Sequence, residues 1–362
     1  MKLSRISTVS ILVLALILVS ACESTENRDA VYSKHKGSNK NVNNSHSDIN
    51  SEVSIDYGLF CGDVCQESLT LQAPRDSIEG KVGLIVSGFF PYGLGTRRMA
   101  EEVAEKYFPK MDLIIDNGDS DPDIQSSIVD DFVSKKVDVI VIDLVEKEAV
   151  NPALERAKAA GIPIITIDRW TPLQGLTLIK ADDVEVGRKA GQYIVNSLEG
   201  KGNVIEMKGT AASTTTIDRN KGILEAFKGY NDIQIIESIN ADFSTDKAQR
   251  MMEGILQRFP EGQIDALVSH ADVMTMGAIK AIEAAGRENE IVVVSVDGQK
   301  SALGAIEAGT IDATVAYPIV MPMGILAAAK TLAGETMPEF IELEAPLITK
   351  ENVAFYKGKT GY

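Results

Sequence analysis

The chain has 362 residues, of which 44% are hydrophobic and 24% charged, and a formal net charge of −16 at pH 7. This length predicts roughly two domains with a core large enough to be stable unaided. The acidic balance argues against non-specific nucleic-acid binding, which depends on Lys and Arg neutralising phosphates, and three cysteines are too few for a disulfide scaffold.

Residues 1–21 are expected to be an export signal. Lys2 and Arg5 precede the apolar run Ile11–Val19, which is too short to cross a membrane as a helix but has the length of a signal-peptide core. The residues leading to Cys22 resemble a bacterial lipobox, which implies cleavage before Cys22 and attachment of a lipid to its thiol. The exported protein would then be anchored at the bacterial cell membrane, in the periplasm or on the outer face. An ordinary signal peptide with an incidental cysteine is the alternative.

Residues 22–55 are expected to be a flexible tether, because Ser, Asn, Lys and acidic residues predominate and few apolar side chains are present. Residues 56–80 follow as a small cap that contains Cys61 and Cys65. Since the compartment outside the cell is oxidising, a local disulfide between these cysteines is the default expectation. A redox pair is the alternative, although such pairs usually have two intervening residues. The three histidines do not cluster with the cysteines, so no metal site is expected.

From Lys81 onward, short apolar runs alternate with longer amphipathic stretches, which predicts parallel strands covered by helices. The predicted strands are 82–87, 113–117, 137–144, 162–168, 176–181, 203–208, 233–239, 266–270, 292–297 and 313–317. The predicted helices include 95–108, 124–136, 149–160, 184–198, 245–258 and 273–285. So many strands exceed one doubly wound sheet, and the pattern falls into two similar halves. The expected fold class is therefore α/β, with two doubly wound parallel-sheet lobes.

Ligands of open α/β sheets bind beyond the carboxyl ends of the strands, so the residues that follow the strands are candidates for a site. Carboxylates, guanidinium groups and aromatic rings follow strands of both halves: Phe89, Phe90, Asp168, Arg169, Arg219, Phe243, Asp272 and Asp297. Carboxylates accept hydrogen bonds from hydroxyls, Arg donates to two oxygens at once, and rings cover the C–H face of a sugar. Each residue also has a structural explanation, such as a turn at Asp297-Gly298 or an ion pair at Asp168-Arg169. Their joint placement predicts a site for a small polyhydroxylated ligand.

Residues from about 81 to 362 resemble the bacterial type I periplasmic sugar-binding proteins of the ribose- and galactose-binding kind. The matching stretches are PIITIDR at 163–169, IDRNKG at 217–222, ADF at 241–243, HAD at 270–272 and SVDG at 295–298. The pattern at 217–222 is similar to the galactofuranose-binding branch in particular. The resemblance implies two lobes joined by a three-crossover hinge. The lobes would be residues 81–182 plus 318–343 and residues 183–317 plus 344–362.

The resemblance also implies roles for individual residues. Asp168, Arg169, Arg219 and Asp297 would bind sugar hydroxyls and the ring oxygen, and Phe243 would form an aromatic wall. Two further candidates come from the family pattern: Arg97, with Arg98 as its alternative, in the first helix, and Tyr317, where the family often has Gln or Glu. The sequence departs from the family at Ala271, where an Asn that bonds the sugar is usual.

The expected function is a lipid-anchored, monomeric solute-binding protein that captures a pentose or hexose and delivers it to an ABC permease. A sugar-sensing receptor that reports to a sensor kinase or chemoreceptor is the alternative, with the cap as its partner surface. Catalysis is not expected, because the chain has no G-x-S-x-G elbow, no P-loop lysine and only the isolated His270 at a strand end. No cofactor is expected, and the export signal argues against a DNA-binding repressor of the same fold.

Overall fold

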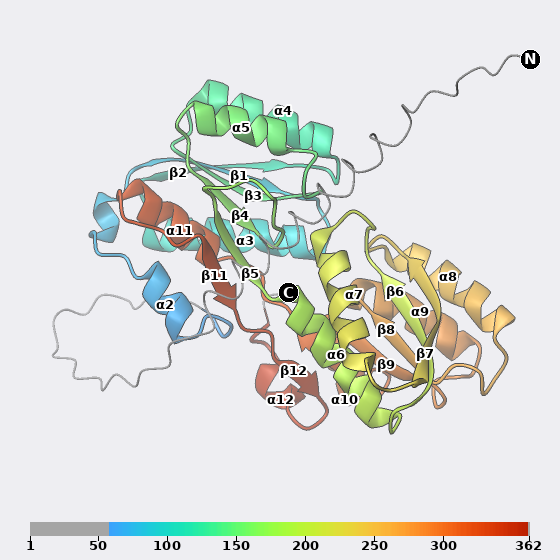
Figure 1. Ribbon diagram of the computed structural model, residues 1–362. Helices are drawn as coiled ribbons and strands as arrows, with labels where there is room; N and C mark the ends of the chain where they lie inside the picture. The colour runs from blue at the N-terminus through green and yellow to red at the C-terminus, as the bar shows by residue number, and fades with distance from the viewer. Residues whose placement is uncertain (1–57, 361–362) are drawn as a thin grey trace, which may run out of the picture. The chain divides into compact units, whose positions relative to one another are not determined.

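The computed structural model describes residues 58–360. The predicted signal peptide, Cys22 and the tether lie outside the described residues. Two six-stranded sheets form the framework of the described part, and each is the centre of one lobe (Figure 1). Helices cover both faces of each sheet, as expected for parallel strands that are apolar on both sides.

The sheet of the first lobe has the strand order β11-β5-β4-β3-β1-β2, and every neighbouring pair is parallel. Its strands are β1 (Gly80–Val86), β2 (Met111–Asn117), β3 (Val139–Asp143), β4 (Ile164–Ile167), β5 (Thr177–Ala181) and β11 (Phe340–Leu343). Its helices are α3 (Pro91–Tyr107), α4 (Pro122–Lys135), α5 (Asn151–Ala159) and α11 (Met323–Leu332). Leu84 and Val86 pack in the apolar cluster that contains α3 and α11, whereas Ile85 packs with α4 and α5. Alternate residues of β1 therefore serve opposite faces of the sheet.

The sheet of the second lobe has the order β12-β10-β9-β8-β6-β7. Its strands are β6 (Lys201–Lys208), β7 (Asp232–Asn240), β8 (Ala266–Ser269), β9 (Val292–Asp297), β10 (Ala313–Ala316) and β12 (Leu347–Thr349). Its helices are α6 (Asp183–Ser197), α7 (Thr214–Phe227), α8 (Thr245–Arg258), α9 (Asp272–Ala284), α10 (Lys300–Ala308) and the short α12 (Val353–Tyr356). Val204 packs with α6 and α7, and its neighbour Ile205 packs with α8, α9 and α10.

Three chain crossings connect the two sheets: from β5 to α6, from β10 to α11, and from β11 to β12. The fold class predicted from the sequence, two doubly wound lobes with three crossovers, is confirmed. All ten predicted strands are present as β1 to β10, but β11 and β12 were not predicted. β12 spans only three residues directly after Pro346, and the exposed Glu342 interrupts the apolar run of β11, so neither segment has the pattern of a buried strand.

Two further predictions differ from the structure. β12 runs antiparallel to β10, so the second sheet is mixed at that edge rather than wholly parallel. Helix α3 begins at Pro91, four residues before the predicted start at Gly95, because proline is favourable in the first helical turn. Gly93 lies inside that turn, and a Cβ on it would come within 1.8 Å of the Gly88 carbonyl oxygen. The glycines that obscured the helix therefore let its first turn pack against the preceding loop.

The residues ahead of β1 form the short helix α2 (Asp63–Leu69) and a 3-10 turn at Arg75–Ser77. The disulfide expected between Cys61 and Cys65 is present, with the two Cα atoms 5.2 Å apart. Among residues 58–360, no helix combines the length and the hydrophobicity needed to span a membrane.

Candidate functional site

A small cavity lies where the carboxyl ends of strands from both sheets meet. Its lining residues come from loops and helix starts of both lobes and from the β10–α11 crossover: Phe90, Tyr92, Asp168, Arg169, Thr215, Arg219, Phe243, Ala271, Val273, Asp297, Gln299 and Tyr317. It offers about 50 Å³ to the centre of a water-sized sphere, room for several water molecules by that measure. The cavity therefore lies where the strand-end rule predicts a ligand site.

Asp168 and Arg169 supply the charged groups of the first lobe. Asp168 follows β4 with a φ of 65°, which turns the chain sharply at the strand end. The Nε atom of Arg169 lies 3.4 Å from Oδ2 of Asp168, and its guanidinium donates to the Leu144 carbonyl oxygen at 2.6 Å. Asp143, at the end of β3, lies behind the pair with Oδ1 3.9 Å from the same guanidinium. These contacts fix the orientation of the Arg169 fork.

Arg219 supplies the guanidinium group of the second lobe in the cavity lining. It lies on α7, and its Nε donates to Oδ1 of Asp183 at 2.9 Å. Its guanidinium also donates to the His270 carbonyl oxygen and lies 3.7 Å from Oδ1 of Asp297. The guanidinium carbon is 4.7 Å from the centre of the Tyr317 ring. A buried cation held by two carboxylates and a ring presents a rigid donor to the cavity.

Asp297 and Asp272 occupy different layers of the site. Asp297 lines the cavity, and the Gln299 side-chain amide donates to its Oδ2 at 3.3 Å. Asp272, which the sequence predicts as a ligand-binding residue, does not line the cavity. Its carboxylate accepts from the backbone N–H of Gln299 at 2.7 Å and from the hydroxyls of Ser295 and Thr314. Because these bonds use both oxygens, Asp272 supports the loop that carries Asp297 and Gln299.

Burial changes the protonation of the carboxyl groups. It raises the pKa of Asp168 and Asp297, and the neighbouring guanidinium groups oppose that rise. Burial also raises the pKa of Asp143 to about 7 and that of Asp272 to about 6. The cavity lining itself balances two carboxyl groups against two guanidinium groups.

Two hydroxyl groups in the lining are buried without a partner. Thr215 Oγ1 and Tyr317 OH have no hydrogen bond to any of the residues that the structure describes. Buried polar atoms are normally paired, so these hydroxyls are poised to bond a molecule in the cavity. Thr215 and Tyr317 stand in different segments of the chain, α7 and the β10–α11 crossover.

Aromatic side chains form much of the remaining wall. Phe90 and Phe243 line the cavity, as predicted, and Tyr92 joins them. A Cβ on Gly209 would lie 2.0 Å from the Phe243 ring, so the absence of a side chain at residue 209 lets the ring take its place. Phe89, which the sequence predicts as a ligand-binding residue, does not line the cavity and is 53% exposed. The chain turns into α3 after Phe89, so only Phe90 and the first helical turn reach the site.

Arg97 also lies away from the cavity. Its side chain is 47% exposed and pairs with Glu101 on the same helix, and it lines a separate groove between α3 and β2. Its alternative, Arg98, is exposed as well and pairs with Glu102. Since α3 begins at Pro91, both arginines stand nearly two turns from the helix start, on its outer side.

Five lining residues were not among the predicted site residues: Tyr92, Thr215, Ala271, Val273 and Gln299. Most stand within three residues of a predicted one, so extending each strand-end motif by one helical turn would have included them. Ala271 places a methyl group in the wall of the cavity.

His270 is buried beneath the cavity rather than in its lining. Its Nε2 lies 3.1 Å from Oε1 of Glu206, which also accepts from Asn220 and Ser238. Burial alone would raise the pKa of Glu206, but these hydrogen bonds outweigh it and lower the pKa to about 2. Burial lowers the pKa of His270, with Glu206 opposing. The pair is a structural network of the second lobe.

Comparison with known proteins agrees with this geometry. Residues 88–333 match the model of a periplasmic binding protein domain. The chain is 31% identical over 280 residues to the ribose import binding protein of Bacillus subtilis. The aligned region covers 75% of this chain and 88% of that protein.

Solved structures share the fold as well. A galactofuranose-binding protein superposes with a TM-score of 0.74 at 29% identity, over 78% of this chain and 99% of that one. The fructose-binding periplasmic domain of a hybrid two-component system superposes with a TM-score of 0.73 at 27% identity, over 77% and 93%. The matched family consists of solute-binding proteins, not enzymes. This chain therefore belongs to the type I periplasmic binding proteins, the family of the ribose- and galactofuranose-binding proteins.

Proposed function

We propose that this protein encloses one small neutral sugar between its two lobes and delivers it to an ABC importer. The observation that carries the proposal is the cavity itself, where carboxyl, guanidinium and hydroxyl groups from both lobes converge on a small space. The similar proteins include a ribose import binding protein and a galactofuranose-binding protein, which supports a sugar as the ligand.

The charges of the lining favour a neutral ligand. Asp168 and Asp297 are balanced by Arg169 and Arg219, and each guanidinium already has a carboxylate nearby. An anionic ligand would compete with those carboxylates, and a cationic one would face the two guanidinium groups. A sugar hydroxyl can both accept from an Arg N–H and donate to a carboxylate, so it satisfies both groups.

The walls of the cavity favour a pentose or hexose. Phe90, Tyr92 and Phe243 offer apolar ring surface for the C–H faces of a sugar. The unpartnered hydroxyls of Thr215 and Tyr317 add two groups that can exchange hydrogen bonds with sugar oxygens.

A ligand held by residues of both lobes implies that the lobes separate to admit it and close around it. Asp168 and Arg169 would hold the sugar from the first lobe, and Arg219 and Asp297 from the second. The protein would act as a monomer, because both halves of the site come from one chain. We place it outside the cytoplasm, anchored to the membrane by a lipid on Cys22.

A sensor role is the second candidate, and one observation favours it. The fructose-binding periplasmic domain of a two-component system has the same fold at 27% identity. Deleting the gene distinguishes the two roles. Loss of sugar uptake supports import, whereas intact uptake with loss of a sugar-induced transcriptional response supports sensing.

A thermal-shift screen against pentoses, hexoses in both ring forms and polyols tests the ligand class. A sugar at 100 times its dissociation constant is expected to stabilise the protein by about 2.7 kcal/mol. If charged sugars or amino acids stabilise the protein and no neutral sugar does, the proposal is wrong.

A further inference from the structure

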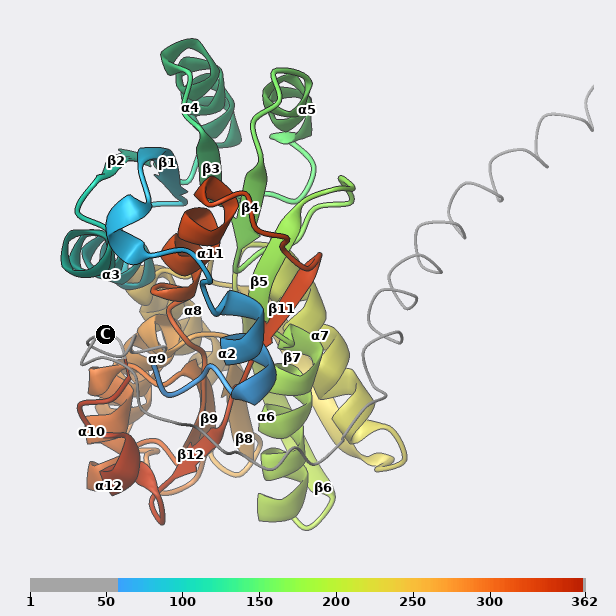
Figure 2. The same ribbon diagram turned by 90° about the vertical axis from the view of Figure 1, so that its left-hand side faces the viewer.

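The disulfide-closed segment ahead of β1 contacts both lobes. Residues 58–79, which we call the strap, comprise the Cys61–Cys65 disulfide, α2 and the 3-10 turn. The sugar-binding site makes no use of them, since none lines the cavity. Figure 2 shows α2 in front of β11 and below α11, on the side of the molecule where the chain crosses between the sheets.

The first end of the strap is attached to the second lobe. Phe60 is buried in an apolar cluster whose other buried members all belong to that lobe, and Leu59 packs against the same cluster. Ile348 in β12 and Val353 in α12 are members of this cluster.

The other end of the strap is attached to the first lobe. Helix α2 packs against α11 and β11. Beyond α2, Lys330 Nζ donates to the Thr70 carbonyl oxygen at 2.8 Å, and the N–H groups of Gln72 and Ala73 donate to Glu335 Oε1 at 2.8 and 3.0 Å. Lys330 and Glu335 lie in and just after α11, so these bonds fix the strap to the first lobe.

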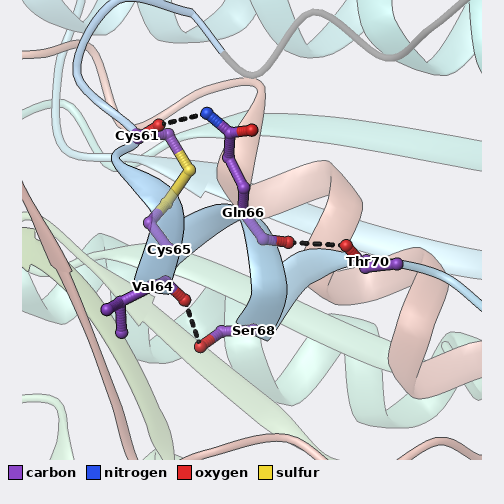
Figure 3. The surroundings of a disulfide bond; sticks show 6 residues. All are labelled: Cys61, Val64, Cys65, Gln66, Ser68 and Thr70. Atoms are coloured by element: carbon purple, nitrogen blue, oxygen red, sulfur yellow. Dashed lines mark hydrogen bonds between the residues drawn. A yellow bond between two sulfur atoms is a disulfide. The ribbon is translucent and has the colours of Figure 1, made fainter. Parts of the chain in front are cut away.

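The link between the two attachments is short and stiffened. The Phe60 carbonyl oxygen accepts from the N–H of Glu344, a residue of the crossing from β11 to β12. Cys61 follows directly, and its disulfide to Cys65 ties this point to the first turn of α2 (Figure 3). The Gln66 side-chain amide also donates to the Cys61 carbonyl oxygen at 2.8 Å. These bonds restrict the movement of Phe60 relative to α2.

From these contacts we propose that the strap is a fourth connection between the lobes, which positions them around the ligand and slows their opening. The inference rests on the proposed function, in which a sugar is enclosed between the lobes. Opening beyond a small angle must withdraw Phe60 from its cluster, lift α2 from α11 and β11, or extend the segment that the disulfide closes. The strap therefore favours the enclosed arrangement over the open one.

Two variants of the full chain test the strap. Phe60→Ala removes the aromatic side chain that packs in the apolar cluster of the second lobe. The double variant Cys61→Ala, Cys65→Ala removes the disulfide that joins this end of the strap to α2. Val64→Ser is the matched control, because Val64 stands between the two cysteines but is 79% exposed. Both test variants are expected to release the stabilising sugar roughly 3 to 10 times faster, because a smaller share of molecules is closed. Reduction of the wild-type protein with dithiothreitol is expected to give the same change without mutation.

A disulfide that only adds stability would lower the melting temperature and leave the release rate of the folded protein unchanged. Equal release rates in wild type and both variants, measured well below their melting temperatures, would overturn the proposal. Small-angle scattering without sugar gives an independent measurement. The two variants are expected to have a larger radius of gyration than wild type and Val64→Ser, and an equal radius would count against the strap. If no sugar binds the wild type, the proposed function fails, while the scattering comparison still decides the role of the strap.

Discussion

The Nε atom of Arg219 donates a hydrogen bond to Oδ1 of Asp183 at 2.9 Å, and both side chains are almost fully buried. Oδ2 of the same Asp183 lies 2.5 Å from the Nζ of Lys180, which stands on β5 of the first lobe. Asp183 therefore bridges the β5–α6 crossover and a cation in the cavity wall. The contact with Asp183 therefore holds the guanidinium group of Arg219, which extends from α7, in one orientation.

Replacing Asp183 is expected to destabilise the protein strongly. The variant Asp183→Ala leaves two buried cations without their shared carboxylate, which typically costs about 3–5 kcal/mol. The surface pair of Arg156 with Asp130 supplies the control, because both side chains are about half exposed. Asp130→Ala is expected to cost less than about 1 kcal/mol. Urea unfolding of both variants measures the difference, and similar losses would contradict the role given to Asp183.

A methyl group on Gly209 is expected to weaken sugar binding through Phe243. The added Cβ would lie 2.0 Å from the ring, so Gly209→Ala must displace an aromatic wall of the cavity. Gly254, inside α8, has no atom within 4 Å of an added Cβ. Gly254→Ala is expected to stabilise the helix by about 0.5–1 kcal/mol without changing affinity. Affinity for the stabilising sugar checks both variants, and unchanged binding in Gly209→Ala would refute the argument.

The buried carboxyl of Asp143 makes stability depend on pH. Its pKa rises from 3.8 to about 7, chiefly through burial, so the folded state holds a proton that the unfolded state releases. The stability from this group is complete below pH 3.8 and is lost as the pH rises through about 7. Asp143→Asn removes the titrating group and keeps its shape. The stability of wild type relative to this variant should fall between pH 4 and pH 7 in denaturant titrations. A constant or rising difference would show that Asp143 is ionised in the folded protein throughout.

Membrane attachment is expected to depend on Cys22. The variant Cys22→Ser cannot form the thioether with a lipid, so the protein should move from the membrane fraction to the soluble fraction. Labelling with an alkynyl fatty acid, followed by cell fractionation, measures both properties. A matched Ser20→Ala variant keeps the cysteine and should remain attached. Membrane association of Cys22→Ser without label would show that another segment anchors the chain.

The sequence predicted most of the fold because most of its strands are apolar runs that alternate with amphipathic helices. The strands from β1 to β10 are mainly apolar runs, whereas β12 has only three residues and the exposed Glu342 interrupts the apolar run of β11. The predicted start of α3 lies four residues too far along the chain, because Gly93 and Gly95 are unfavourable residues for a helix.

The site was predicted less completely for a related reason. A strand-end rule identifies loops, not the direction of each side chain. It identified Asp168, Arg169 and Asp297 in the lining, but Phe89 and Phe90 are adjacent in sequence and only Phe90 reaches the cavity. Asp272 has the residue type of a ligand contact, yet its oxygens are used by Ser295, Thr314 and the Gln299 backbone. Such choices depend on packing between segments that are distant in sequence.

The most direct test of the account is a calorimetric titration of the sugar that the thermal-shift screen identifies. Wild type and the control Arg97→Ala, whose side chain lies outside the cavity, are expected to bind one sugar molecule per chain with equal affinity. The double variant Asp168→Ala, Arg169→Ala loses charged hydrogen-bonding groups in the cavity, each typically contributing about 1.5–3 kcal/mol, so binding should disappear. Retained binding in the double variant, or a loss of binding in Arg97→Ala alone, would contradict the assignment of this cavity as the sugar site.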